Sequence, residues 1–90
     1  MSGQYEIEFR HSIKKDLKKI PSQFLASIIR AIENLGNDPY TSGVVRITDT
    51  DSYYRIRVGE YRVIYEILKN DHKIVVLYIR HRKNAYLSNI

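Results

Sequence analysis

Residues 54–65, YRIRVGEYRVIY, consist of two runs of β-branched and aromatic residues separated by Gly59-Glu60. Such runs are typical of β-strands. Glycine at the first of two central positions suits the type II′ turn of a tight hairpin, because that position requires a positive φ angle. This stretch therefore predicts two antiparallel strands joined by a two-residue loop.

The register of this hairpin predicts that arginines gather on one side of the sheet. Across a two-residue loop Arg57 faces Arg62, and Arg55 projects from the same side. Like charges directly opposite each other are destabilising, whereas a favourable cross-strand pair contributes about 0.2–1 kcal/mol. The pattern indicates an anion between the guanidinium groups, because a planar guanidinium can hold a phosphate through two hydrogen bonds. The alternative is a solvated face whose arginines pair with Glu60, Glu66 or a carboxylate of the preceding loop.

The residues before the hairpin predict one strand and two helices. Residues 4–9 alternate between polar and apolar side chains, which is the period of a half-buried strand. Helical spacing of apolar residues follows over residues 10–20 and 22–35, and Pro21 between them predicts a corner. Gly36 then stands where a left-handed helix cap is expected.

The whole chain predicts a single α+β domain of residues 1–90 with the order β-α-α-β-β-β. Residues 40–52 form a polar connection, and strands over 53–58, 61–68 and 73–80 follow it. The last strand is apolar almost without interruption, which predicts a central strand covered on both sides. The expected architecture is an N-terminal strand and a two-helix hairpin packed on an antiparallel β-sheet.

Charge and composition narrow the function. The chain has a formal net charge of +5 and a pI of about 9.6, an excess that favours a polyanionic partner. It has no cysteine, and no apolar run approaches the ~20 residues that span a bilayer, so a cytoplasmic protein without membrane contact is expected. Paired carboxylates, histidine motifs at metal-binding spacing and a glycine-rich phosphate loop do not occur, so neither a metal nor a cofactor is expected.

A second basic group follows the last strand. Residues 79–86 read IRHRKNAY, and antiparallel pairing brings the start of this segment beside the strand that holds Arg62. His81 is a candidate acid or base, because the ordinary pKa of histidine is close to neutral. The alternative is a charge cluster that keeps an apolar strand from aggregating, with the tyrosine packed over the sheet edge and the histidine in solvent. The candidate residues here are Arg80, His81, Arg82, Lys83 and Tyr86.

These motifs resemble those of the RelE/ParE toxins. The similarity lies in the hairpin of residues 54–65, in the C-terminal segment 79–86 and in GNDP at residues 36–39, and it extends over nearly the whole chain. It implies the toxin of a type II toxin–antitoxin system. In RelE-type members it further implies a ribosome-dependent endoribonuclease, which cuts messenger RNA in the A site by attack of the 2′-hydroxyl, without a metal ion.

The resemblance also implies roles for individual residues. Arg62 matches the arginine that contacts the scissile phosphate. Arg82 matches a C-terminal arginine that stabilises the phosphate or donates a proton, and Tyr86 matches the tyrosine proposed as general base. Arg55 and Arg57 stand where RelE proteins often have lysines that hold the RNA backbone. Further phosphate contacts are expected from Arg80 and Lys83.

The implied partners are a cognate RelB-like antitoxin, the ribosome and messenger RNA, with a toxin–antitoxin heterotetramer as an expected assembly. Two other functions fit the same residues. A ParE-like toxin would inhibit DNA gyrase without nuclease activity. A non-enzymatic RNA-binding module would use the arginines for phosphate contacts and Tyr53 and Tyr54 for stacking. Replacing Tyr86 by phenylalanine separates a binder, which would barely respond, from a nuclease, which would lose activity.

Overall fold

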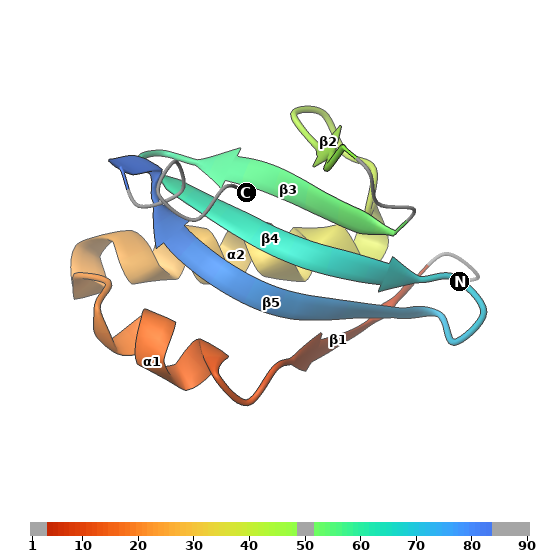
Figure 1. Ribbon diagram of the computed structural model, residues 1–90, viewed down its shortest axis with the longest axis horizontal. Helices are drawn as coiled ribbons and strands as arrows, with labels where there is room; N and C mark the ends of the chain where they lie inside the picture. The colour runs from red at the N-terminus through yellow and green to blue at the C-terminus, as the bar shows by residue number, and fades with distance from the viewer. Residues whose placement is uncertain (1–3, 49–51, 84–90) are drawn as a thin grey trace.

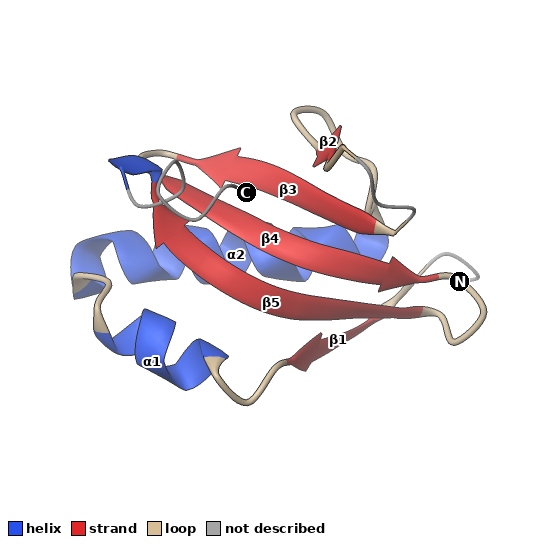
Figure 2. Cartoon of the chain, in the orientation of Figure 1, coloured by secondary structure: helices blue, strands red, loops and turns tan. Residues whose placement is uncertain are grey.

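Residues 4–48 and 52–83 are described by the computed structural model of the chain (Figure 1). The elements in these ranges are β1 (Glu6–Phe9), α1 (Ile13–Lys18), α2 (Ser22–Asn37), β2 (Val45–Arg46), β3 (Tyr53–Val58), β4 (Tyr61–Leu68) and β5 (Lys73–His81). The five strands of this part of the chain form one sheet in the order β1-β5-β4-β3-β2. In Figure 1 α2 lies behind the sheet and α1 lies beside the end of β5, and Figure 2 separates the two helices from the strands by colour.

The α+β fold predicted from the sequence is confirmed, and so is the antiparallel meander of β3, β4 and β5. β1 instead runs parallel to β5, with Glu6 beside Lys73, so the sheet as a whole is mixed rather than antiparallel. β5 lies inside the sheet, but the central position belongs to β4, which corrects the expectation for the last strand. β2 pairs Val45 with Arg55 at the far edge. β2 lies in the segment that the sequence predicts to be a polar connection. A strand of two residues is too short to show an alternation of polar and apolar side chains, so the sequence does not predict it.

The helices differ in how closely they follow the predicted ranges. α1 is shorter than the helical pattern of residues 10–20, because the Arg10 N–H still donates to the Val76 carbonyl at 3.0 Å and so continues the strand. Pro21, with φ −57° and ψ 141°, makes the predicted corner before α2. Neither described helix is long and apolar enough to cross a bilayer.

The hydrophobic core lies between the helices and one side of the sheet, which we call the helix side. Its buried members are Ile13, Ile20, Ile28, Ile32, Leu35, Val63, Tyr65, Ile67, Ile74, Val76 and Ile79. Among the described residues no charged side chain is buried. The hydroxyl of Tyr65 donates a hydrogen bond to the Pro39 carbonyl at 2.8 Å, and burial raises the pKa of this phenol well above its ordinary value. The helix side is thus apolar, with its buried phenol satisfied.

Gly36 corrects the predicted end of the second helix. The residue is helical, α2 continues to Asn37, and the φ angle of Gly36 is not positive, so the expected left-handed cap does not form. Its carbonyl accepts a hydrogen bond from the Tyr5 N–H at 2.6 Å. A Cβ atom at this position would lie 3.1 Å from the Tyr5 carbonyl oxygen. Glycine therefore allows the chain just before β1 to approach α2 closely.

The hairpin between β3 and β4 forms as predicted. Gly59 has a φ angle of +60° and Glu60 does not have a positive φ, which is the combination of a type II′ turn. Arg57 stands opposite Arg62, and Val58 opposite Tyr61, as the two-residue loop requires.

A bulge between β4 and β5 changes the phase of the last strand. Tyr65 pairs with Val76, whereas the preceding Ile64 pairs with Tyr78, so Leu77 is an extra residue in β5. Each residue of β5 after the bulge consequently faces the side opposite to the one that plain alternation would give. Tyr78 lies away from the helix side as a result.

Candidate functional site

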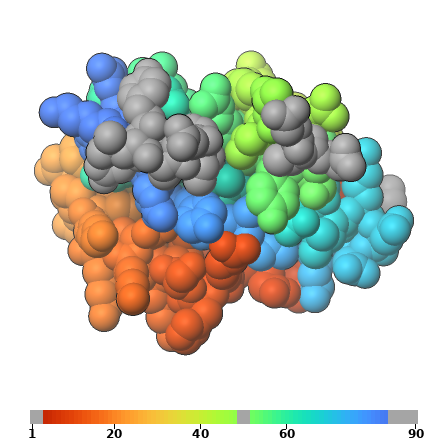
Figure 3. Space-filling model, in the orientation of Figure 1, coloured from red at the N-terminus to blue at the C-terminus, as the bar shows by residue number. Residues whose placement is uncertain are grey.

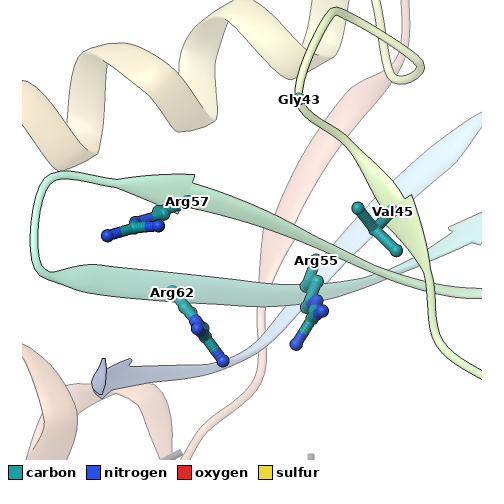
Figure 4. Close-up of a pocket in the computed structure, with 5 residues that line it drawn as sticks. All are labelled: Gly43, Val45, Arg55, Arg57 and Arg62. Atoms are coloured by element: carbon teal, nitrogen blue, oxygen red, sulfur yellow. The ribbon is translucent and has the colours of Figure 1, made fainter. Parts of the chain in front are cut away.

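Arg55, Arg57 and Arg62 meet on the side of the sheet opposite the helix side, which we call the arginine side. Together with Gly43 and Val45 they line a pocket of about 190 Å³, here named the arginine pocket (Figure 4). Figure 4 shows Arg55 and Arg62 extending from neighbouring strands toward the same space, while Arg57 reaches toward the hairpin turn. The clustering predicted from the hairpin register is confirmed.

The two glutamates considered as partners for these arginines make other contacts. A carboxylate oxygen of Glu60 lies 3.4 Å from Arg82 Nε, and Glu66 accepts a hydrogen bond from Ser52 Oγ at 3.2 Å. Arg57 Nε donates to the Gly59 carbonyl at 3.3 Å, which orients its guanidinium without neutralising it. Within residues 4–48 and 52–83 no carboxylate forms an ion pair with Arg55 or Arg57. Among the described residues, Arg55 and Arg57 therefore carry positive charge that an incoming anion can balance.

Arg80 lies next to the arginine pocket, because it stands opposite Arg62 in the pairing of β4 and β5. Its Nη1 atom is 2.7 Å from Oδ2 of Asp16 in α1. The same carboxylate oxygen accepts a hydrogen bond from the Ile79 N–H at 3.0 Å, beyond the point where β1 stops pairing with β5. The space-filling view shows the α1 region, in orange, in contact with the end of β5, in blue (Figure 3). Arg80 thus lies beside the pocket with much of its charge balanced by Asp16, and it also fastens α1 to the sheet.

The basic segment at the end of β5 does not gather at the arginine pocket as a whole. His81 stands opposite Tyr61 and contacts its ring edge-on at a centroid distance of 5.2 Å. Because Tyr61 packs against the core, His81 lies on the helix side, away from the arginine pocket. The Lys83 N–H donates to Nδ1 of His81 at 3.4 Å. Arg82 is tied to the hairpin turn, since its N–H donates to the Glu60 carbonyl at 2.7 Å. Tyr86 lies outside the described residues.

Two residues that the sequence analysis did not single out also lie on the arginine side. Tyr78 stands opposite Ile64 there, and Arg10, just after β1, donates from Nη1 to the Tyr78 hydroxyl at 3.1 Å. The sequence carries no sign of the bulge that places Tyr78 on this side. Arg10 was not singled out because the helical pattern predicted for residues 10–20 begins with it. Among the described residues no group of histidine, aspartate and glutamate side chains is arranged to hold a metal ion.

The fold and this site can be compared with known proteins. A family model described as the ParE toxin of the type II toxin–antitoxin system parDE matches residues 7–86. This chain belongs to the ParE toxin family of type II toxin–antitoxin systems. The chain is 31% identical to the putative toxin RelE1 of Methanocaldococcus jannaschii. The alignment covers 92% of this chain and 96% of that relative.

Solved structures similar to this ParE-family toxin include complexes of RelE with RelB. The archaeal RelE–RelB complex from Pyrococcus horikoshii OT3 aligns with a TM-score of 0.78 and 25% identity, covering 88% of this chain and 96% of that one. The toxin–antitoxin complex RelBE2 from Mycobacterium tuberculosis aligns with a TM-score of 0.76 and 26% identity, covering 88% and 99%. The protein is therefore a RelE-like toxin of a type II toxin–antitoxin system.

Proposed function

We propose that this toxin is an endoribonuclease that cuts messenger RNA in the ribosomal A site. The observation that carries the proposal is the arginine pocket, where Arg55, Arg57 and Arg62 gather around one space and no described carboxylate pairs with the first two. A pocket of this charge fits a phosphodiester of the RNA backbone. Fixed positive charge is also what the reaction needs, because the transition state concentrates negative charge on the phosphate oxygens.

Arg62 is the residue that we assign to the scissile phosphate. It lies on β4, the central strand, between Arg57 on one neighbouring strand and Arg80 on the other. A donor held on a central strand is fixed more firmly than one on a loop, and removing one such donor typically lowers a rate by about 10²–10³-fold. Arg55 and Arg57 then hold the flanking backbone.

The proton transfers follow from the chemistry of 2′-hydroxyl attack. Tyr86 takes the proton of the 2′-hydroxyl, whose oxygen bonds to phosphorus as the bond to the 5′-oxygen breaks, leaving a 2′,3′-cyclic phosphate. An ordinary tyrosine has a pKa of about 10, so the proposal requires positive charge near Tyr86 to lower that pKa toward the working range. A guanidinium keeps its proton, so we assign Arg82 to stabilising the phosphate, and the 5′-oxygen is protonated by water. His81 lies against Tyr61 on the helix side and receives no step.

The partners of the toxin follow from the same proposal. A weak base combined with abundant positive charge suits an enzyme whose substrate is positioned by its target, here messenger RNA held by the ribosome in the cytoplasm. The complexes of RelE with RelB support a RelB-like antitoxin for this toxin. We further propose that toxin and antitoxin assemble as a heterotetramer. An antitoxin that covers the arginine side would inhibit the toxin by occupying the phosphate site.

A second candidate function is inhibition of DNA gyrase, because the matching family model carries the ParE name. In that case the arginine side would contact protein or DNA without cutting RNA. The two functions differ in their need for Tyr86, which a pure inhibitor does not require.

Cleavage of a defined messenger RNA by the purified toxin, with and without programmed ribosomes, tests the proposal. We expect cuts only when ribosomes are present, cleavage slower by about 10²–10³-fold in Arg62→Ala, and a comparable loss in Tyr86→Phe. Arg30→Ala is the matched control, since Arg30 is an exposed arginine of α2 behind the sheet. Intact RNA under all conditions contradicts the proposal, and loss of supercoiling activity in a gyrase assay would then support the second function.

A further inference from the structure

A second positive cluster lies on the arginine side, outside the arginine pocket. Its centre is the ring of Tyr78, with the guanidinium carbon of Arg80 4.7 Å from the ring centroid and that of Arg10 5.4 Å from it. Arg10 also donates from Nη1 to the Tyr78 hydroxyl at 3.1 Å. Side chains from the end of β1 and from β5 therefore meet around one aromatic ring.

This cluster is continuous with the arginine pocket. Arg57, Arg62 and Arg80 form a row across the adjacent strands β3, β4 and β5, since each stands opposite the next. Two inter-strand spacings separate the ends of this row, which is about 10 Å. Arg10, through its contact with Tyr78, extends the row beyond β5. A single-stranded RNA backbone crossing the pocket along this row would reach Arg10.

The two arginines that flank Tyr78 differ in their partners. Arg80 is paired with Asp16 at 2.7 Å, so much of its charge is already balanced. Arg10 is exposed, and within residues 4–48 and 52–83 no carboxylate forms an ion pair with it. A guanidinium has five N–H donors, and the Tyr78 hydroxyl accepts from one nitrogen only. Arg10 thus keeps donors and full charge for a ligand, while Tyr78 limits the freedom that binding would have to remove.

We propose that Arg10 is a second phosphate-binding residue, which holds the backbone phosphate of a nucleotide adjacent to the one in the arginine pocket, with Tyr78 as its positioning residue. The inference rests on the proposed function for the identity of the polyanion as single-stranded RNA. Arg10 adds a contact near the edge of the sheet that β1 forms, on the same side as the arginine pocket. The RNA backbone would then cross the strands from β3 toward β1.

The competing explanation is that the contact between Arg10 and Tyr78 only ties the turn between β1 and α1 to the sheet. In that case removal of Arg10 changes stability and leaves RNA binding as it was. The salt dependence of binding separates the two, because each phosphate contact to a single strand contributes about 0.7 to the slope of log K against log salt concentration.

The test is a binding measurement with an RNA hexanucleotide that carries 2′-O-methyl groups throughout and therefore cannot be cut. Affinity of the full chain is measured from 0.05 to 1 M salt for the wild type, Arg10→Ala and Arg30→Ala, which remove the same charge from opposite sides of the sheet. We expect Arg10→Ala to lower the slope by about 0.7. The ratio of wild-type affinity to variant affinity should then be about fivefold larger at 0.1 M salt than at 1 M salt. Arg30→Ala and the charge-conserving Tyr78→Phe should keep the slope, the second with reduced affinity.

NMR titration of the wild type with the same RNA covers the case in which Arg10→Ala fails to fold. The Nε–Hε signal of Arg10 should move with the same dissociation constant as those of Arg55 and Arg62. Equal slopes for Arg10→Ala and the wild type, an Arg10 signal that stays still, or no binding by the wild type overturns the inference. Cleavage on ribosomes is a separate readout. If Arg10 contacts RNA but the toxin cuts no messenger RNA, the inference about Arg10 holds and the proposed nuclease activity is wrong. If the toxin cuts messenger RNA but Arg10 makes no RNA contact, the nuclease activity holds and the inference about Arg10 is wrong.

Discussion

The helix side and the arginine side of the same sheet differ in how they accommodate neighbouring side chains. On the helix side, β4 contributes Val63 and Tyr65 to an apolar core in which the phenol is satisfied by a backbone carbonyl. On the arginine side, the same strand contributes Arg62 between two other arginines. Like charges in opposition lower stability, whereas the apolar contacts raise it. One strand thus serves folding with one face and, in our proposal, RNA binding with the other.

Truncation on the helix side should give the largest effect on stability. Ile32 of α2 is 1% exposed within the core, so Ile32→Ala removes buried methylene groups and leaves a cavity. We expect the free energy of unfolding to fall by about 2–5 kcal/mol, measured by urea denaturation. Arg30→Ala on the exposed face of the same helix should stay within about 0.5 kcal/mol of the wild type. Equal losses for the two variants would contradict the assignment of the core.

Asp16 links α1 to the end of β5, where Ile79 faces the helix side and Arg80 the arginine side. Asp16→Ala removes the acceptor of the Ile79 N–H and the partner of Arg80, both in a partly buried setting. We expect a loss of about 1–3 kcal/mol in the free energy of unfolding, because a partly buried donor is left without a partner. Amide hydrogen exchange at Ile79 should accelerate in the variant. Unchanged exchange there would mean that Asp16 does not protect the end of β5.

A smaller effect is expected at the buried phenol of Tyr65. Tyr65→Phe leaves the buried Pro39 carbonyl without its donor and should cost about 1 kcal/mol at neutral pH. Burial raises the pKa of this phenol, so the folded state holds its proton more tightly than the unfolded chain does. The stability from this residue is present below a pH of about 10 and is lost as the pH rises further toward the folded pKa.

Urea denaturation at pH 9 and pH 11 tests this dependence. The wild type should lose about 1 kcal/mol more than Tyr65→Phe between these values, because the variant lacks the titrating group. Other tyrosines titrate in both proteins and cancel in the difference. A parallel decline of the two proteins would show that Tyr65 is no better protected from ionisation when folded than when unfolded.

The sequence predicts the two sides of the sheet unevenly. The hairpin at Gly59 follows from local chemistry, because a two-residue turn fixes which side chains face each other, and it correctly places Arg55, Arg57 and Arg62 together. The extra residue at Leu77 has no local marker, since a run of apolar residues accepts a bulge at several positions.

The sequence therefore could not predict which side of the sheet the residues after the bulge face. The bulge turns Tyr78 to the arginine side and sets His81 against Tyr61 on the helix side. The left-handed cap predicted at Gly36 is wrong for a related reason. The need for glycine arises from the close approach of Tyr5, a contact between segments that are far apart in the chain, and not from the local helix end.

Arg57→Thr tests whether the arginine side is arranged for phosphate at a cost in stability. The change removes one like charge opposite Arg62 and introduces a residue that favours strands. On a single preparation we would measure the free energy of unfolding and the rate of messenger RNA cleavage on ribosomes. We expect the free energy of unfolding to rise by about 0.2–1 kcal/mol and cleavage to become slower. Lower stability with unchanged cleavage would contradict it and identify the arginines as part of the fold.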